Sequence, residues 1–215
     1  LLKSKIKKYK EELDLYAKDY RVLVLVKASN KKLENLVVIG YLLLQGKIRK
    51  EAPDTLRYFK EQGVKIKIIS GDNPDTVYGI AVRAGLSKNS RKIDASTLKT
   101  DKDILDAVDY YDIFGRVTPE QKKKFILALQ RLGHTVAMTG DGVNDVLALK
   151  EADCSIAMAN GSDASKNVSQ LVLLDSNFSS MPHVVAEGRR TINNIERSAS
   201  LFLVKTIYAT LLAII

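Results

Sequence analysis

Cysteine is almost absent from this sequence of 215 residues, which contains only Cys154. A single cysteine excludes an internal disulfide framework, and the apolar neighbours in "DCSIAMA" predict a buried, inert thiol. The first ten residues have no long apolar run and no small-residue cleavage pattern, so they do not resemble a secretory signal. Solenoid-length repeats and low-complexity tracts are absent too. We expect a globular protein in a reducing, cytoplasmic setting.

Acidic residues are fewer than basic residues, 25 against 34, so the formal net charge is +9. Such a balance suits a nucleic acid, an anionic membrane surface or a phosphate-bearing substrate as partner. The sequence has no helix-turn-helix, zinc-finger or aromatic RNA-binding signature. We therefore expect no nucleic-acid partner, and assign the charge to phosphate handling and the cytoplasmic membrane face.

Long hydrophobic runs are missing except at the carboxyl end. Residues 201–215, "LFLVKTIYATLLAII", are apolar apart from Lys205, but they are fewer than the roughly 20 needed to cross a bilayer. We interpret them as the start of a truncated transmembrane helix, because a buried amphipathic helix, the alternative, would have a more polar face. The preceding residues 181–200 carry three arginines and predict a stalk that joins a soluble body to a membrane.

The rest of the chain divides near residues 45–49. Residues 1–20 predict a surface helix, and the β-rich runs 21–29 and 36–44 predict a hairpin-like pair. From Glu51 onward, short strands alternate with helices, which predicts an α/β fold with a parallel sheet between helices. The predicted strands are 64–70, 112–117, 135–138, 155–159 and 170–174, and the predicted helices are 51–63, 74–85, 119–133 and 143–152.

Two turns with acidic residues follow predicted strands, "SGDN" at 70–73 and "TGDGVND" at 139–145. In parallel sheets, ligands gather at the carboxyl ends of strands, where loops and helix amino termini converge. In the first turn Asn73 can cap the next helix and Pro74 can begin it. Asp72 is then left to face the crevice, unless it too serves only as a local cap.

Glycine backbone and hydroxyl donors beside carboxylates point to a phosphate with a cation. Ser70 and Gly71 can donate to phosphate oxygens, whereas Asp141 and Asp145 would repel a phosphate unless Mg²⁺ lay between them. The cluster of Asp141, Asn144 and Asp145 therefore predicts a Mg²⁺ site, the alternative being that these residues only cap the turn.

A run of three lysines, 122–124, lies near the start of the predicted helix 119–133. With Phe125, Ile126 and Leu129 on the inner face, Lys122 is at its edge and the other two lysines point outward. Lys122 can reach the crevice and offset phosphate and carboxylate charge. The alternative is a lysine whose stem covers apolar surface.

These motifs, in this order, resemble the phosphorylation domain of P-type cation-transporting ATPases, of the haloacid-dehalogenase-like superfamily. The resemblance rests on "SGDN", "RVTPEQK" at 116–122, "TGDGVND", "ADCSIAMANGSDASK" and "LVLLDSNF". It implies a Rossmannoid parallel sheet with helices on both faces, lacking its nucleophile strand. It also implies the following domains: 1–44 the end of a nucleotide-binding domain, 45–49 a hinge, 50–180 the second part of the phosphorylation domain, 181–200 a stalk, and 201–215 the start of a membrane helix.

The resemblance also implies roles around a metal. Asp141 would be the principal carboxylate on Mg²⁺, and Asp145 would assist at the metal and hold hydrogen bonds. Asn144 would contact the phosphoryl group. Lys122 would balance charge at a phosphorylated acid, as phosphoryl transfer by positioning and electrostatics requires.

In the first turn, Ser70 and Gly71 would bind phosphate oxygens and Asp72 would organise the loop. ATP, the transported cation, the membrane and the remainder of the same pump would be the partners, with the soluble part on the cytoplasmic side.

Two departures from the family pattern stand out. The family's nucleophile is the aspartate of an Asp-Lys-Thr-Gly-Thr motif, and this sequence has no such motif. We therefore expect this chain alone to be inactive, because an aspartyl-phosphate needs that carboxylate. Gly46 also stands where the family usually has an acid in the hinge. A soluble haloacid-dehalogenase-like phosphatase and a non-catalytic module that binds Mg²⁺ and phosphate are the alternative functions.

Overall fold

A computed structural model describes residues 2–16, 20–30 and 37–214. Its amino-terminal part consists of α1 (Leu2–Tyr16) and an antiparallel pair, β1 (Arg21–Lys27) and β2 (Val37–Leu44). The pair confirms the predicted hairpin-like strands, although residue 36 and most of the linker before it lie outside the described residues. Tyr41 links β2 to α1, because its hydroxyl donates a hydrogen bond to Glu12 at 3.0 Å.

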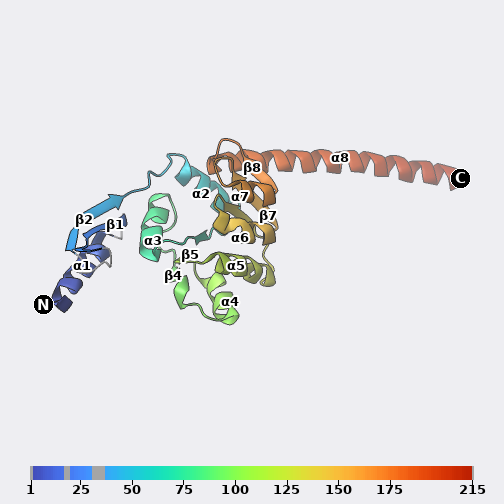
Figure 1. The fold of residues 1–215 in the computed structure, drawn as a ribbon. Coiled ribbons are helices and arrows are strands. Elements are labelled where there is room, and N and C mark those ends of the chain that lie inside the picture. Colours follow the sequence, from blue (N-terminus) through green and yellow to red (C-terminus); the bar gives the residue numbers. More distant parts are fainter. Residues whose placement is uncertain (1, 17–19, 31–36, 215) are drawn as a thin grey trace.

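The α/β body contains two three-stranded parallel sheets (Figure 1). In one, β5 (Ile113–Gly115) lies between β3 (Ile68–Ile69) and β4 (Lys92–Asp94). In the other, β7 (Cys154–Met158) lies between β6 (Ala137–Gly140) and β8 (Leu171–Leu173). All pairings are parallel, as the alternation of strands and helices predicts. Among the described residues, β3 and β6 are therefore edge strands.

Helices connect and cover these strands. They are α2 (Ala52–Glu61), α3 (Pro74–Arg83), α4 (Asp101–Tyr110), α5 (Pro119–Arg131), α6 (Val146–Glu151) and α7 (Asp163–Val168), with short 3₁₀ turns η1 (Ala95–Thr97), η2 (Val143–Asp145) and η3 (Phe178–Ser180). Local sequence explains their starts. Thr118 and Gln121 form a reciprocal capping box ahead of Pro119 at the first position of α5.

The main core lies between α4, α5, α6 and the strands. Phe114 of β5 and Phe125 of α5 are fully buried, with ring centroids 4.8 Å apart. Ile126 and Leu149 complete the same cluster. Burying side chains of this size stabilises the fold by about 1.5–3 kcal/mol each. This cluster fixes the start of α5, and with it Lys122, against the strand ends.

Three features differ from the sequence-based expectation. The predicted polar loop between α3 and residue 112 contains β4, η1 and α4. In α4, Ile104, Ala107 and Val108 face inward at helical spacing, while four aspartates obscure the pattern. In place of the predicted strand 64–70, the structure has a strand of two residues, β3, which begins only at Ile68. Cys154, predicted to be buried, is only partly buried.

The chain ends in one continuous helix, α8 (Met181–Ile214), which projects from the body (Figure 1). Its base is held by Phe178, whose ring lies 5.5 Å from that of Phe59, and by Arg189, which donates to Gln62 at 2.7 Å. Every residue from Ala186 to Ile214 is exposed. By length and composition, α8 with the preceding turn is able to cross a membrane.

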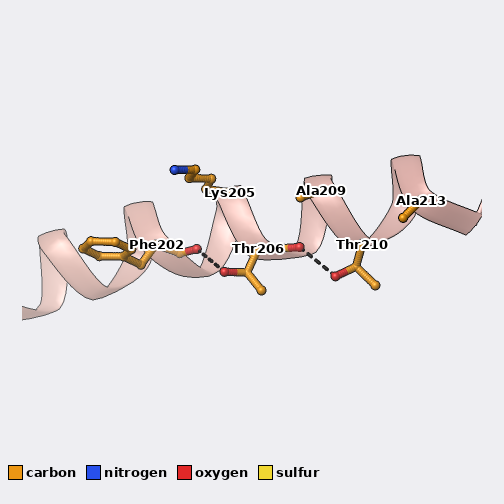
Figure 2. Close-up of a pocket in the computed structure, with 6 residues that line it drawn as sticks. All are labelled: Phe202, Lys205, Thr206, Ala209, Thr210 and Ala213. Carbon is orange, nitrogen blue, oxygen red and sulfur yellow. Dashed lines mark hydrogen bonds between the residues drawn. The ribbon is translucent and has the colours of Figure 1, made fainter.

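Hydroxyl groups on the distal part of α8 are satisfied inside the helix. Thr206 donates to the carbonyl of Phe202, and Thr210 to the carbonyl of Thr206, each at 2.9 Å (Figure 2). Lys205 projects from the helix beside them (Figure 2). Internal bonding of this kind lets threonine enter an apolar environment. The division into a stalk and a membrane segment, however, stays a prediction.

Candidate functional site

The first acidic turn lies between β3 and α3. Asn73 caps α3 by accepting from the Asp75 N–H at 2.8 Å, and Pro74 takes the first helical position, as predicted. The Ser70 hydroxyl accepts from the Asp72 N–H at 3.1 Å. Asp72 and Gly71 are exposed. The turn therefore offers a hydroxyl, a glycine backbone and a carboxylate at the carboxyl end of a strand.

The second acidic turn follows β6. Asp145 is 8% exposed, and its Oδ2 accepts from the Gly142 N–H at 3.2 Å. A Cβ at Gly140 would lie 2.6 Å from the Cβ of Asp145, so only glycine lets this carboxylate fold back over the strand end. Asp141 and Asn144 are exposed. The turn thus places one buried carboxylate beside one exposed carboxylate.

Lys122 reaches this second turn. Its ammonium lies 2.6 Å from Oδ1 of Asp145, and the two side chains are 12% and 11% exposed. The two neighbouring lysines point elsewhere: Lys123 pairs with Glu151, and Lys124 with Asp101. The helical spacing places Lys122 correctly. The sequence predicted that Lys122 would offset carboxylate charge in the crevice, but it did not single out Asp145 as the partner, because it assigned Asp145 to a metal.

The two turns are connected through one segment of chain. The backbone N–H groups of Arg116 and Val117 donate to the carbonyls of Asp72 and Ser70, at 2.8 and 3.0 Å. Six residues after Arg116 comes Lys122, which pairs with Asp145. Segment 116–122 therefore contacts both turns, and it contains the "RVTPEQK" motif.

A third loop supports Asp141 from behind. The N–H of Ser162 donates to the Asp141 carbonyl at 2.7 Å, and a Cβ at Gly161 would lie 2.7 Å from that same oxygen. The hydroxyl of Ser165, which is fully buried, donates to the Gly142 carbonyl at 3.3 Å. Sequence reasoning gave these residues no role, although "NGSDASK" holds glycine and hydroxyl side chains in a turn-forming cluster.

The residues present fit Mg²⁺ better than a cation that needs an all-protein cage. No group of three or more His, Cys, Asp or Glu able to hold a metal occurs in the part of the chain that the structure describes. Asp141 offers one exposed carboxylate, whereas the two oxygens of Asp145 accept from Lys122 and from the Gly142 N–H. Mg²⁺ characteristically takes one or two carboxylates and completes its shell with water and phosphate oxygens.

One charged group near the site has a shifted pKa. Hydrogen bonding from Ser96, followed by the guanidinium of Arg116, holds the pKa of Asp94 below its usual value. Asp94 ends β4 and lies beside Gly115 in the register with β5. It is therefore ionised at neutral pH and able to anchor Arg116.

Comparison with known proteins places this geometry in a family. The family model described as haloacid dehalogenase-like hydrolase matches residues 3–153. This chain belongs to the haloacid dehalogenase-like hydrolases. The resemblance that the motifs indicate is confirmed, because the relatives of this hydrolase domain include cation-transporting ATPases.

A "Calcium-transporting ATPase CtpE" of Mycobacterium bovis is 53% identical over 178 residues, covering 82% of this chain and 22% of that protein. A "Probable cation-transporting ATPase exp7" of Streptococcus pneumoniae is 45% identical over 222 residues, covering 100% of this chain and 28% of that protein. The chain thus spans about a quarter of the length of these relatives.

Solved structures show the same fold. The crystal structure of a zinc-transporting PIB-type ATPase in its E2.Pi state matches with a TM-score of 0.62 at 24% identity, covering 89% of this chain and 26% of that one. The confirmed fold is a mixed α/β hydrolase domain with parallel sheets and a long carboxyl-terminal helix.

Proposed function

We propose that this chain is the Mg²⁺- and phosphate-handling part of a P-type ATPase, which couples ATP hydrolysis through an aspartyl-phosphate to cation transport across a membrane. The observation that carries the proposal is the buried pair of Lys122 and Asp145 at the end of β6, next to the exposed Asp141. Relatives named as calcium-transporting ATPases make Ca²⁺ the first cation to test.

In this proposal the second turn holds the metal. Asp141 is the accessible ligand, and Asp145 becomes the second when Lys122 turns its ammonium toward the phosphoryl group. Asn144 contacts that group from the same turn. Mg²⁺, when bound, would neutralise charge on the transferred phosphoryl oxygens. Lys122 then balances the remaining negative charge without being consumed.

The first turn holds the phosphate. The Ser70 hydroxyl already accepts from Asp72, so its own hydrogen is available to an oxygen on the crevice side. The Gly71 N–H adds a second donor, and Asp72 organises the loop. Donors fixed before the reaction stabilise developing charge at little reorganisation cost.

The phosphorylated aspartate would come from a strand outside this chain. In the described residues, β3 and β6 each pair on one side only, and both end in an acidic turn. Ala137 of β6 is exposed and Ile68 of β3 is partly exposed, although parallel strands are normally covered on all sides. A further parallel strand between them would complete the sheet and deliver its carboxylate to the same edge.

The remaining assignments follow from this function. Residues 181–200 act as a stalk and 201–215 begin a membrane helix, with the body on the cytoplasmic side. Residues 1–44 end a nucleotide-binding domain, and the remainder of the pump and ATP are the partners. The exposed apolar side chains of β1 and β2, including Leu23, Leu25 and Ile39, are consistent with this proposal, because the rest of such a domain would cover them.

Phosphoenzyme formation tests the proposal. The intact protein that contains this chain is incubated with Mg²⁺ and ATP labelled in its γ-phosphate. We expect acid-stable, hydroxylamine-labile label, which Asp141→Asn abolishes. Asp109→Asn is the matched control, because that carboxylate is exposed and its ion pair is with the exposed Lys65, which belongs to neither acidic turn. Equal labelling of both variants, or no labelling of the wild type, would refute the proposed function.

The chain by itself separates the alternatives. We expect it to form no phosphoenzyme and to hydrolyse no phosphate monoester, because the acceptor carboxylate is missing. Hydrolysis of p-nitrophenyl phosphate by the purified chain would instead favour a soluble phosphatase. Tight Mg²⁺-dependent nucleotide binding by the purified chain would favour a non-catalytic module.

A further inference from the structure

The segment that follows β7 lies directly against the second acidic turn. The Ser162 N–H donates to the Asp141 carbonyl at 2.7 Å, and the Ser165 hydroxyl donates to the Gly142 carbonyl at 3.3 Å. Two consecutive carbonyls of the turn are therefore bound by one short segment, residues 159–165. We call residues 159–165 the brace; they comprise the loop after β7 and the start of α7.

The brace and the turn approach each other at backbone distance. A Cβ at Gly161 would lie 2.7 Å from the carbonyl oxygen of Asp141 and 3.0 Å from its Cα. No real side chain fits at such distances, so any residue other than glycine at 161 would push the brace and the turn apart. The contact between the two segments therefore depends on the glycine.

The brace is tied to the fold on its other side. The N–H of Ala159 donates to the carbonyl of Leu173, the last residue of β8, at 3.0 Å. The N–H of Asn160 donates to the hydroxyl of Ser176, just beyond that strand, also at 3.0 Å. The brace thus connects the acidic turn after β6 to the end of β8, and a turn held in this way has little freedom to move.

Ser165 is the buried centre of the brace. Its side chain is fully buried, and its N–H donates to the Ser162 hydroxyl oxygen at 3.1 Å. Its own hydroxyl is in hydrogen-bond contact with the Ser162 hydroxyl and with the Gly142 carbonyl. Removing this hydroxyl would take from the Gly142 carbonyl a donor that water cannot easily replace in a buried position.

Asp141 has a particular need for this support, because its carboxylate is exposed. An exposed side chain is not held by packing against neighbours, so its direction depends on the backbone that carries it. Groups that orient a metal ligand from outside the coordination shell typically change metal affinity by about tenfold to a hundredfold when they are removed. The brace holds the backbone of the residue that is proposed to bind Mg²⁺.

We propose that the brace is a positioning element for the metal: Gly161 and Ser165 hold the backbone of Asp141 and Gly142 so that the Asp141 carboxylate meets Mg²⁺ without rearrangement. This inference rests on the proposed function, because it takes Asp141 as a ligand of Mg²⁺. Gly161 and Ser165 act through the backbone of the turn, so neither is a metal ligand. Loosening the brace should therefore weaken Mg²⁺ binding, whereas losing a similar hydrogen bond elsewhere in α7 should not.

Two substitutions loosen the brace in different ways. Ser165→Ala removes the buried hydroxyl, and Gly161→Ala places a methyl group against the Asp141 carbonyl. Ser169→Ala is the matched control for the first, because the Ser169 hydroxyl donates to the Ser165 carbonyl at 2.8 Å and not to the acidic turn. Gly188→Ala is the control for the second, because a Cβ there meets nothing within 4 Å.

The first assay is phosphoenzyme formation by the intact protein at increasing Mg²⁺ concentrations. We expect the half-saturating Mg²⁺ concentration to rise by about threefold to tenfold in Ser165→Ala and by about tenfold to a hundredfold in Gly161→Ala. Both controls should stay within about twofold of the wild type, and saturating Mg²⁺ should restore the full level of phosphoenzyme in Ser165→Ala. A lower maximal level with an unchanged half-saturating Mg²⁺ concentration would mean that the brace only stabilises the fold, and would overturn the proposal.

A second readout needs neither bound metal nor phosphorylation. In ¹⁵N relaxation of the Mg²⁺-free 215-residue chain, we expect the order parameters of the Asp141 and Gly142 amides to fall from about 0.85 toward 0.6 in Ser165→Ala and to stay unchanged in Ser169→Ala. Unchanged order parameters in Ser165→Ala would refute the positioning role, whether or not Gly161→Ala folds. Absence of wild-type phosphoenzyme, with the loss of order present, would instead refute only the proposed function.

Discussion

Replacing Lys122 by methionine removes the positive partner of a buried carboxylate. The methionine retains the apolar stem, so the packing of this side chain of α5 is largely kept. Asp145 would remain 8% exposed with one hydrogen bond, from the Gly142 N–H. The change therefore isolates the charge from the volume.

The distance gives the magnitude. Two unit charges 2.6 Å apart attract by about 6 kcal/mol at an effective dielectric constant of 20. Desolvation offsets part of this attraction, and removing one member of a buried pair typically destabilises by about 3–5 kcal/mol. We expect Lys122→Met to lose about that much of the free energy of unfolding, a large share of the roughly 5–15 kcal/mol of a typical domain.

Urea unfolding of the Mg²⁺-free chain, followed by circular dichroism, measures this loss. Lys124→Met is the control, because that lysine pairs with Asp101 in an exposed position and should cost less than about 1 kcal/mol. The double variant of Lys122→Met with Asp145→Asn should recover most of the loss, since no unpaired charge then remains. A loss in Lys122→Met no larger than in Lys124→Met would refute this reasoning.

Three further predictions concern other parts of the molecule. Gly140→Ala should destabilise by about 1–3 kcal/mol in the same urea assay, because its Cβ would lie 2.6 Å from Asp145, whereas Gly46→Ala, with nothing within 4 Å, should not. Burial lowers the pKa of Lys67 in the folded state. At pH values between this folded pKa and the unfolded value of about 10.4, the unfolded state binds more protons than the folded state. The free energy of unfolding should therefore rise with pH in this window. Lys67→Met should lack this rise, and an identical pH dependence of stability in the variant and the wild type would contradict the prediction. Deleting residues 201–214 should abolish flotation of the chain with lipid vesicles, and unchanged flotation would argue against a membrane segment.

Local signals in the sequence were sufficient for much of the fold. Asn73 and Pro74 have cap preferences that depend only on neighbouring backbone, and the structure places them as predicted. Lys122 was located correctly because helical periodicity fixes its angle relative to Phe125. The helix α4 was missed because its four aspartates mask a short inner face, although Thr100 and Asp103 form a capping box that could have revealed it.

Contacts between segments that are distant in the chain could not be predicted from the sequence. Nothing in the local sequence predicts the ion pair of Arg116 with Asp94, because the two residues lie 22 positions apart in the chain. The bracing of Asp141 by Ser162 likewise depends on how two loops meet after folding. The ion pair of Asp145 was missed since a carboxylate beside glycines suits a metal and a lysine equally well.

The unbroken course of α8 has a mechanical consequence. At 1.5 Å per residue, its 34 residues make a rod about 51 Å long. Among the described residues, α8 is held near its first turns, by the buried Met181, by Phe178 just before it and by Arg189, whereas the residues from 190 to 214 are exposed. A tilt of about 10° at that grip would sweep the far tip through roughly 9 Å, given this length. Small rearrangements at the base of α8 would therefore be amplified into displacements of several ångströms at its distal end.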